Sequence, residues 1–162
     1  SRPHAIPGPR QVQKGDFIAM DFGCVYAGYC SDMTRTIALG QISDEQKKVY
    51  DTVLEAHLMA KEAIEVGKLY CEIDQVARDH IYKNGYEGCF GHSLGHSLGL
   101  LIHEMPGFSQ ICKEVITPNV IVTVEPGIYL NGKFGVRIED MVLIGEKTAE
   151  SLTKSEKKLI TL

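Results

Sequence analysis

Five side chains of types that bind metal ions recur along this chain, each in a short motif punctuated by Gly or Pro. They are Asp21, Asp32, His96, Glu125 and Glu139. Four carboxylates drawn together from distant parts of a chain repel one another strongly unless cations neutralise them. Carboxylates with one imidazole suit Mn²⁺, Co²⁺, Zn²⁺ or Fe²⁺, unlike the sulfur-rich cages of structural zinc. Two such ions, roughly 3.5–4 Å apart, can hold a water as hydroxide and polarise a carbonyl, so the set predicts a two-metal hydrolase.

The two aspartates lie in runs that predict a β-hairpin. Asp16 to Gly23 and Tyr29 to Leu39 have strand-like composition, and a short turn separates them. Because side chains alternate between the faces of a strand, cross-strand pairing can place Asp21 and Asp32 on one face. The alternative is that both aspartates are solvated at the rim of a sheet.

Three histidines fall within one glycine-rich segment: His92, His96 and His103. Small residues in the same segment permit a close approach of backbone or ligand. They are Gly91, Gly95 and Gly99. A single histidine in an apolar run is more often a hydrogen-bonded core residue than a ligand, but the clustering favours a site.

The two glutamates interrupt apolar strands. Val120 to Val124 predicts a buried strand that ends at Glu125, and Gly135 to Ile144 predicts a second strand that contains Glu139. A carboxylate in such a place is costly unless it is paired or binds a metal. The alternative is a strand-end glutamate that leans into water, which fits Glu125 better than Glu139. Arg137, two residues before Glu139, is expected on the same face.

Two helices are predicted between the aspartates and the histidines. The first begins at Ser43, which can form a capping box with Gln46, and ends near Val66. The second runs from about Cys71 to Asn84. His57 on the first helix is interpreted as a packed or surface residue and not as a ligand. The order of strands, two helices and strands indicates an α+β fold.

In this order, the motifs resemble the catalytic domain of the Xaa-Pro dipeptidase and Xaa-Pro aminopeptidase group of dinuclear metallopeptidases. That group has the pita-bread fold, which it shares with methionine aminopeptidase and creatinase. The resemblance covers almost all of residues 1–162 and implies a curved, mostly antiparallel sheet with helices on its outer face. Each half of that fold contributes two helices. We therefore expect a catalytic domain that is incomplete at its N-terminus and lacks the first two helices.

The resemblance assigns a role to each predicted ligand. Asp21 resembles the family's terminal aspartate, and Asp32 and Glu139 resemble its two bridging carboxylates. His96 and Glu125 resemble ligands of the other ion. Glu125 would also act as the general base, taking a proton from a metal-bridging water that attacks as hydroxide.

Four further residues resemble the family's catalytic and substrate-binding groups. His92 and His103 match the histidines that orient the substrate and stabilise the tetrahedral intermediate. Arg137 and His4 resemble the groups that meet the proline end of the substrate, and a guanidinium fork suits a carboxylate well. His4 is assigned mainly because it lies 17 residues before Asp21.

The resemblance implies hydrolysis of the bond between an N-terminal residue and proline, with Mn²⁺ as the first choice of metal. The methionine aminopeptidase branch is an alternative, but its last two glutamates are separated by a longer insert than the 14 positions between Glu125 and Glu139. An inactive peptide- or protein-binding member is another alternative, against which the complete set of ligands weighs. Ser97 and Leu101 stand where glycine and an acidic residue are common, and Leu101 would alter the pocket wall.

Length and composition fit one globular domain over residues 1–162, with 44% hydrophobic and 23% charged residues. A net charge of −4 provides no electrostatic footprint for nucleic acid. No apolar run reaches the roughly 20 residues that cross a bilayer. Five scattered cysteines without C-x-x-C spacing predict reduced thiols and a cytoplasmic location. Missing helical cover predicts a homo-oligomer or association with an N-terminal segment.

Overall fold

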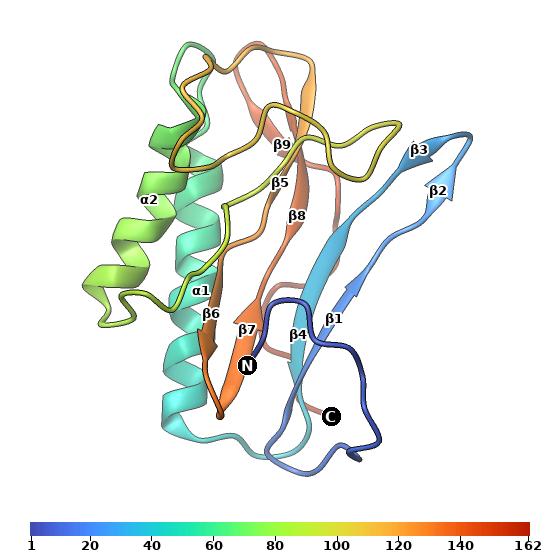
Figure 1. Cartoon of the computed structure of the whole chain (residues 1–162), viewed down its shortest axis with the longest axis vertical. Helices are drawn as coiled ribbons and strands as arrows, with labels where there is room; N and C mark the ends of the chain where they lie inside the picture. Colours follow the sequence, from blue (N-terminus) through green and yellow to red (C-terminus); the bar gives the residue numbers. More distant parts are fainter.

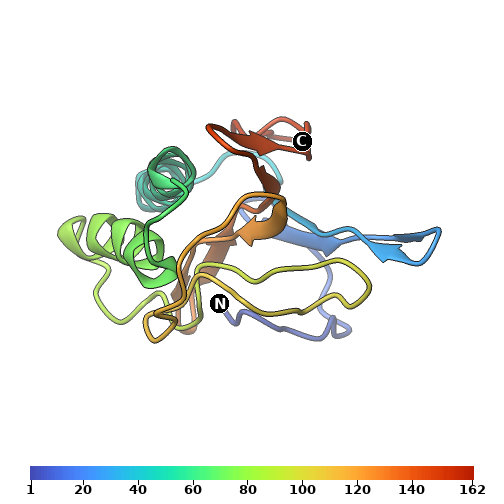
Figure 2. The ribbon, with the colours of Figure 1, turned by 90° about the horizontal axis from the view of Figure 1, so that it is seen from above.

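The computed structural model describes residues 1–162 and places two helices on one side of a group of antiparallel strands (Figure 1, Figure 2). The helices are α1 (Asp44–Ala63) and α2 (Tyr70–Lys83). The strands are β1 (Phe17–Phe22), β2 (Val25–Tyr26), β3 (Tyr29–Cys30), β4 (Met33–Ala38), β5 (Val120–Val124), β6 (Gly127–Leu130), β7 (Phe134–Arg137), β8 (Asp140–Ile144) and β9 (Ala149–Ser151). All strand pairs are antiparallel.

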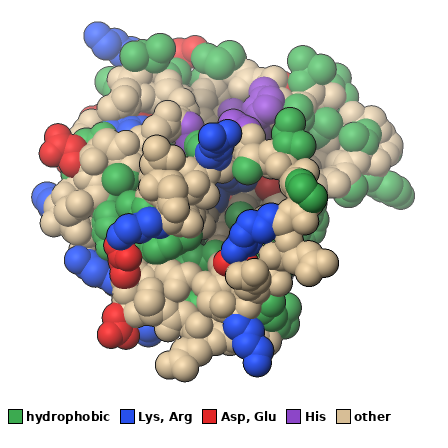
Figure 3. Space-filling model, turned by 60° about the horizontal axis from the view of Figure 1, so that its bottom comes forward, with side chains coloured by type: hydrophobic (Ala, Val, Ile, Leu, Met, Phe, Trp, Pro, Cys, Tyr) green, Lys and Arg blue, Asp and Glu red, His purple; other side chains and the backbone are tan.

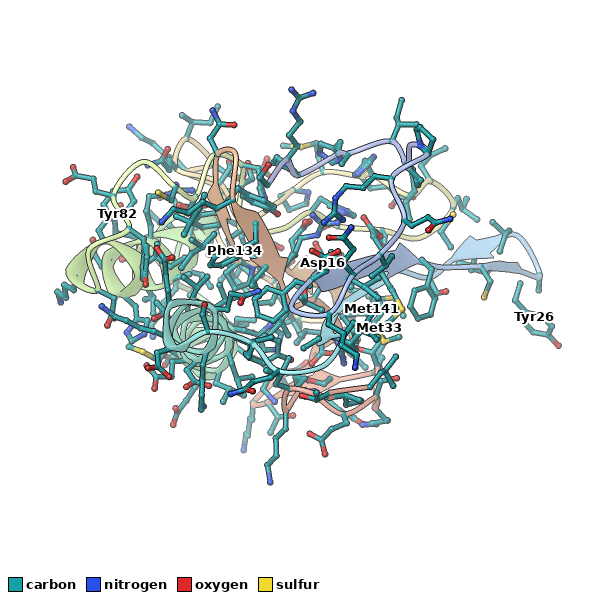
Figure 4. The ribbon with its side chains drawn as sticks, turned by 90° about the horizontal axis from the view of Figure 1, so that it is seen from below. Asp16, Tyr26, Met33, Tyr82, Phe134 and Met141 are labelled. Carbon is teal, nitrogen blue, oxygen red and sulfur yellow. The ribbon has the colours of Figure 1, made fainter.

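The predicted hairpin is confirmed, although its two strands are each interrupted. β1 pairs with β4 so that Asp21 lies opposite Thr34. Beyond this pair, β2 and β3 form a narrow arm that projects from the molecule (Figure 1). Ala27 and Gly28 have φ angles of 49° and 86°, as a two-residue hairpin turn requires. Tyr26 lies near the tip of the arm and points away from the rest of the chain (Figure 4).

The capping box that starts α1 is confirmed. The Gln46 N–H donates to Ser43 Oγ at 3.2 Å, and the Ser43 N–H donates to Gln46 Oε1 at 2.9 Å. The prediction that α1 continues to about Val66 is wrong. Ile64 already has an extended backbone, and the Gly67 N–H donates to a distant carbonyl, which directs the chain away from the helix axis. Neither helix combines the length and hydropathy needed to cross a membrane.

The apolar core lies between the helices and the strands. From α1 it takes a stripe at helical spacing, which comprises Val49, Val53, Ala56 and Ala60, all with no exposed surface. The same cluster includes inward-facing residues of the strands, such as Val122, Val124, Val136 and Val142. His57 lies on this face of α1 and is fully buried, so its interpretation as a packed residue is confirmed. The helices therefore pack through this core against one face of the strands.

The prediction of one continuous strand from Gly135 to Ile144 is wrong, because β7 and β8 are separated by two residues. β5 pairs with β8, and β6 pairs with β7, so that the four strands form one long antiparallel hairpin. Each arm of this hairpin is interrupted, and the two interruptions lie opposite each other. On one side Pro126 has no N–H to donate to the facing strand. On the other, the Glu139 N–H donates at 3.1 Å to the carbonyl of Thr34. The interruption thus places Glu139 beside β4, while the Glu125 N–H donates to the carbonyl of Leu94 at 2.8 Å.

Residues 94–98 run alongside β5 although they form no regular strand. The Thr123 N–H donates to the His96 carbonyl at 2.7 Å. A Cβ at Gly95 would lie 1.9 Å from the Thr123 carbonyl oxygen, so only glycine permits this approach. The predicted close approach is therefore confirmed at Gly95. At Gly91 a Cβ would meet nothing within 4 Å, so no backbone approaches that position.

Candidate active site

One cavity of about 340 Å³ is lined by every side chain that the sequence assigns to the site. These residues are His4, Asp21, Asp32, His92, His96, His103, Glu125, Arg137 and Glu139. Figure 3 shows histidine side chains gathered on one part of the surface, with apolar side chains beside them. Residues from five separate parts of the sequence thus converge on one place.

Three of the predicted ligands form a tight cluster. One side-chain donor atom from each of Asp32, His96 and Glu139 lies within 4.8 Å of the others. His96 Nε2 also lies 3.4 Å from Glu125 Oε1. His96 Nδ1 is 3.0 Å from the Ser97 carbonyl, which can only accept, so Nδ1 carries the proton. The lone pair on Nε2 therefore faces the carboxylates, which is the arrangement of a metal-binding histidine.

Threonine hydroxyls hold the two late glutamates. Thr34 Oγ1 donates to Glu139 Oε2 at 2.6 Å, and Thr123 Oγ1 donates to Glu125 Oε1 at 3.0 Å. Neither of the other two carboxylate oxygens has a hydrogen-bond partner in the protein. Each acid is thus oriented through one oxygen, while its second oxygen stays available at the cavity.

Burial outweighs the attraction of the nearby Arg137 guanidinium in setting the pKa of Glu125 and of Glu139. Burial raises the pKa of Glu125 well above its usual value, and the nearby charge of Glu139 raises it further. Burial likewise raises the pKa of Glu139 and of Asp32. Burial lowers the pKa of His96, so this imidazole is neutral at pH 7. A bound cation would reverse the effect on the acids, because it stabilises their ionised forms.

Arg137 joins several cavity residues through its guanidinium group. Its Nη2 donates to Asp21 Oδ2 at 2.6 Å, and its Nε donates to Thr34 Oγ1 at 3.1 Å. Its Nη1 donates to the Tyr129 hydroxyl and to the Pro3 carbonyl, both at 3.0 Å. Arg137 and Glu139 both contact the Thr34 side chain, as expected for residues on the same face. The contact with Asp21 fixes the orientation of that predicted ligand.

The hydrogen bonds of His92 define its protonation. Its Nδ1–H donates to the Ser93 carbonyl at 2.8 Å, so Nε2 accepts from the Tyr129 hydroxyl at 2.9 Å. Burial lowers the pKa of His92 to about 4, which keeps the ring neutral at pH 7. Tyr129 therefore donates to His92 and accepts from Arg137, and it links the two.

The sequence reasoning did not identify Tyr129 as part of the site. The signal that could have found it is the pair of glycines beside it. A Cβ at Gly127 would lie 2.6 Å from the Tyr129 hydroxyl oxygen, and one at Gly135 would lie 2.8 Å from the ring. The Tyr129 ring therefore fits only because positions 127 and 135 carry no side chain. Thr34 and Thr123, which orient the glutamates, were also not identified.

His103 and His4 lie at the open side of the cavity and are exposed. The His103 ring packs edge-on against the His96 ring, with 4.4 Å between their centroids. His103 makes no hydrogen bond within the protein, so both its nitrogens face the cavity or solvent. Together with Asp21, these two histidines are the exposed members of the predicted site.

Comparison with known proteins identifies relatives of the whole chain. Residues 1–146 match metallopeptidase family M24. The chain is 44% identical to the Xaa-Pro dipeptidase of Pyrococcus furiosus over 158 residues, which is 98% of this chain and 45% of that protein. It is similar to the structure of an Xaa-Pro dipeptidase from Bacillus anthracis, with a TM-score of 0.96 and 48% identity over 99% of this chain and 45% of that one. The X-Pro aminopeptidase of Thermotoga maritima has a TM-score of 0.95 and 43% identity, covering 99% of this chain and 46% of that one. The chain thus spans less than half the length of these relatives.

Proposed function

The chain belongs to metallopeptidase family M24, and we propose that residues 1–162 form part of a catalytic domain that hydrolyses the bond between an N-terminal residue and proline. The α+β and pita-bread fold prediction is confirmed by the similarity to Xaa-Pro dipeptidase structures. The observation that carries the proposed function is the convergence of Asp32, His96 and Glu139 with Glu125 and Asp21 on one cavity.

The donor set fits two divalent ions. Asp21, Asp32, His96, Glu125 and Glu139 would hold them, because Asp32, Glu125 and Glu139 form no ion pair with a lysine or arginine and the free lone pair of His96 faces the cluster. We propose Mn²⁺, with Co²⁺, Zn²⁺ and Fe²⁺ accepted by the same ligands. When bound, the ions would supply a bridging water of lowered pKa as the nucleophile and would polarise the scissile carbonyl.

The protein's own groups would move the protons. Glu125 has one oxygen oriented by Thr123 and one free, and it would accept a proton from the attacking water and return it to the leaving nitrogen. His103 has free nitrogens at the cavity and would donate to the oxygen of the tetrahedral intermediate. His92 has both nitrogens engaged and would mainly keep the surrounding groups in place for the substrate.

Arg137 and His4, which both line the cavity, would meet the proline end of a substrate. Arg137 Nη1 lies at the cavity and now donates to the Pro3 carbonyl, a partner that a substrate carboxylate can replace. His4 follows Pro3 directly and would add a second contact. The proposed substrate is accordingly a peptide with proline at its second position.

Two alternatives predict different behaviour. Methionine aminopeptidase-like activity would give cleavage without a proline requirement, but the 14-residue spacing of Glu125 and Glu139 favours the proline-specific branch. An inactive peptide- or protein-binding member would bind without turnover. The intact donor set weighs against this second alternative, since binding alone does not require it.

We further propose a cytoplasmic chain without nucleic-acid or membrane partners. All five cysteines are free, which is usual in a reducing compartment. The arm and the adjoining loop expose Tyr26 at 83%, Val25 at 69% and Leu100 at 67% of their surfaces. Such apolar exposure supports association, either as a homo-oligomer or with an N-terminal segment.

The proposal is tested by offering three substrates after chelation and resupply of Mn²⁺: an Xaa-Pro dipeptide, a longer peptide that begins Xaa-Pro, and a Met-Ala peptide. Cleavage restricted to the proline substrates is expected, and their ratio distinguishes dipeptidase from aminopeptidase. Cleavage of Met-Ala with equal efficiency would overturn the proline specificity. Binding of Mn²⁺ without any cleavage would favour the inactive alternative for this chain.

A further inference from the structure

A second buried carboxylate network lies directly behind the cavity. Asp140 follows Glu139, and Arg35 follows Thr34, so that alternation turns Asp140 and Arg35 away from the cavity. The Asp140 side chain is fully buried, and the Arg35 side chain is 6% exposed. The network is therefore the reverse side of the same backbone that presents Thr34 and Glu139 to the site.

Both oxygens of Asp140 are fully hydrogen-bonded. Oδ1 accepts from Arg35 Nη2 and from Thr153 Oγ1, each at 2.7 Å. Oδ2 is 2.8 Å from Lys157 Nζ and 3.2 Å from His57 Nε2. A carboxylate offers about four lone-pair sites, and all are used here. This carboxylate consequently has no capacity left for a ligand.

The donors around Asp140 also hold the backbone beside the predicted ligands. Arg35 Nη1 donates to the Thr34 carbonyl at 2.8 Å and to the Glu139 carbonyl. His57 Nδ1 is 3.0 Å from the carbonyl of Val124, the residue before Glu125. The His57 ring thus lies between the Val124 carbonyl and the Asp140 carboxylate, within hydrogen-bond distance of both. One network thus cross-links β4, the end of β5 and the start of β8.

We propose that Arg35, His57 and Asp140 are positioning residues that set the spacing of the cavity carboxylates, and thereby the affinity for divalent ions. The inference rests on the proposed function of the cavity. Asp32, Glu125 and Glu139 come from three segments that the network joins. When those segments are fixed before an ion binds, less conformational entropy is lost on binding. Groups that orient metal ligands from behind also raise the affinity for the metal.

The chain after residue 146 completes this network, although the family match ends there. Arg35 Nη2 and Nε donate at 3.0 Å to the carbonyls of Ser155 and Glu156. Thr153 and Lys157 supply two of the four donors to Asp140. The structure therefore assigns residues 153–157 to the functional unit of the cavity.

The test measures Mn²⁺ binding by titration calorimetry on the chelated chain, for wild type, Asp140→Asn and Lys157→Met. We expect the dissociation constant to rise on the order of 10- to 100-fold for Asp140→Asn, as for lost outer-shell partners of other metal sites. A smaller rise is expected for Lys157→Met, since three donors remain. With a proline substrate, kcat at limiting Mn²⁺ should fall while KM stays unchanged.

Ile81→Ala is the matched control, because Ile81 is a buried core residue of α2 that makes none of these hydrogen bonds. It should lower the melting temperature but keep the wild-type affinity for Mn²⁺ at temperatures where the chain is folded. If Asp140→Asn does not fold, Lys157→Met and Thr153→Val, which keep the pair of Arg35 with Asp140, decide the question.

Variants that are less stable but bind Mn²⁺ like the wild type would overturn the inference and leave the proposed function intact. A wild-type chain that binds no Mn²⁺ would instead overturn the proposed function, and the inference with it. Weaker Mn²⁺ binding by the network variants, with unchanged Mn²⁺ binding by Ile81→Ala, supports the inference.

Discussion

Glu139 and Asp140 are adjacent and both buried, yet their surroundings are opposite in character. Asp140 has four hydrogen-bond donors, which hold its pKa far below the usual range despite burial. Glu139 receives one hydrogen bond, from Thr34, and burial raises its pKa. The fully paired acid behaves as a structural element. The incompletely paired acid has the character of a binding site, because buried charge persists only when something else neutralises it.

The largest effect is expected on turnover, from Glu125→Gln. This variant tests whether the incompletely paired acids of the cavity take part in catalysis. The amide keeps the size and the hydrogen bond from Thr123 but cannot accept a proton. Loss of a general base costs on the order of 10²–10⁴ in turnover. Steady-state kinetics with a proline peptide measure the loss, and circular dichroism should show an unchanged fold. Activity near that of the wild type would remove Glu125 from the mechanism.

The same acid-to-amide change at the two adjacent positions should have opposite effects on stability. Asp140→Asn leaves Arg35 and Lys157 without their anion and should cost about 3–5 kcal/mol of unfolding free energy. Glu139→Gln in the metal-free chain should cost nothing or stabilise it, because it removes repulsion with the neighbouring acids. Urea unfolding in the presence of a chelator measures both. Equal losses of unfolding free energy in the two variants would contradict the distinction between a fully paired Asp140 and an incompletely paired Glu139.

Gly95→Ala asks whether the cavity also depends on close backbone packing. The added Cβ would meet the Thr123 carbonyl at 1.9 Å, so residues 94–98 must move away from β5. We expect a loss of about 1–3 kcal/mol or more, as for overpacking elsewhere, with weaker Mn²⁺ binding through His96. Gly91→Ala is the control, since nothing lies within 4 Å of its Cβ. Thermal unfolding that does not separate the two variants would contradict the described packing.

The smallest effect is expected from Tyr129→Phe, which removes the hydroxyl between His92 and Arg137 but keeps the ring in its glycine-lined space. One net hydrogen bond is worth about 1 kcal/mol. The decrease in kcat/KM should therefore be less than about tenfold, with Mn²⁺ affinity unchanged. A loss as large as that of Glu125→Gln would mean that the Tyr129 hydroxyl takes part in the reaction itself.

Local features of the chain could be predicted from the sequence, and long-range ones could not. The Ser43 capping box and the short turn before Tyr29 depend on neighbouring residues, and both were predicted. The end of α1 and the break before Asp140 were missed, because contacts with distant segments determine them. Glu139 could be singled out as a carboxylate inside an apolar strand. Glu139 lies outside β8 because its N–H donates to the Thr34 carbonyl of β4, and no local sequence pattern indicates this hydrogen bond.

The candidate site follows the same division. Each predicted ligand stands in its own recognisable motif, so all five could be proposed from the sequence, and all five line one cavity. The groups that orient them could not, because Thr34 and Thr123 are ordinary strand residues until their partners are known. Asp140 illustrates the difficulty best, since its four donors come from three separate parts of the chain.

The most direct measurement counts the Mn²⁺ ions bound by the chelated wild-type chain in titration calorimetry, with Glu139→Gln beside it. The account predicts saturable binding of two ions by the wild type, and a weakened or lost ion in the variant, since Glu139 is proposed as a ligand of both ions. No saturable binding by the wild type, or identical binding in Glu139→Gln, would contradict the claim that these buried acids form a two-metal site.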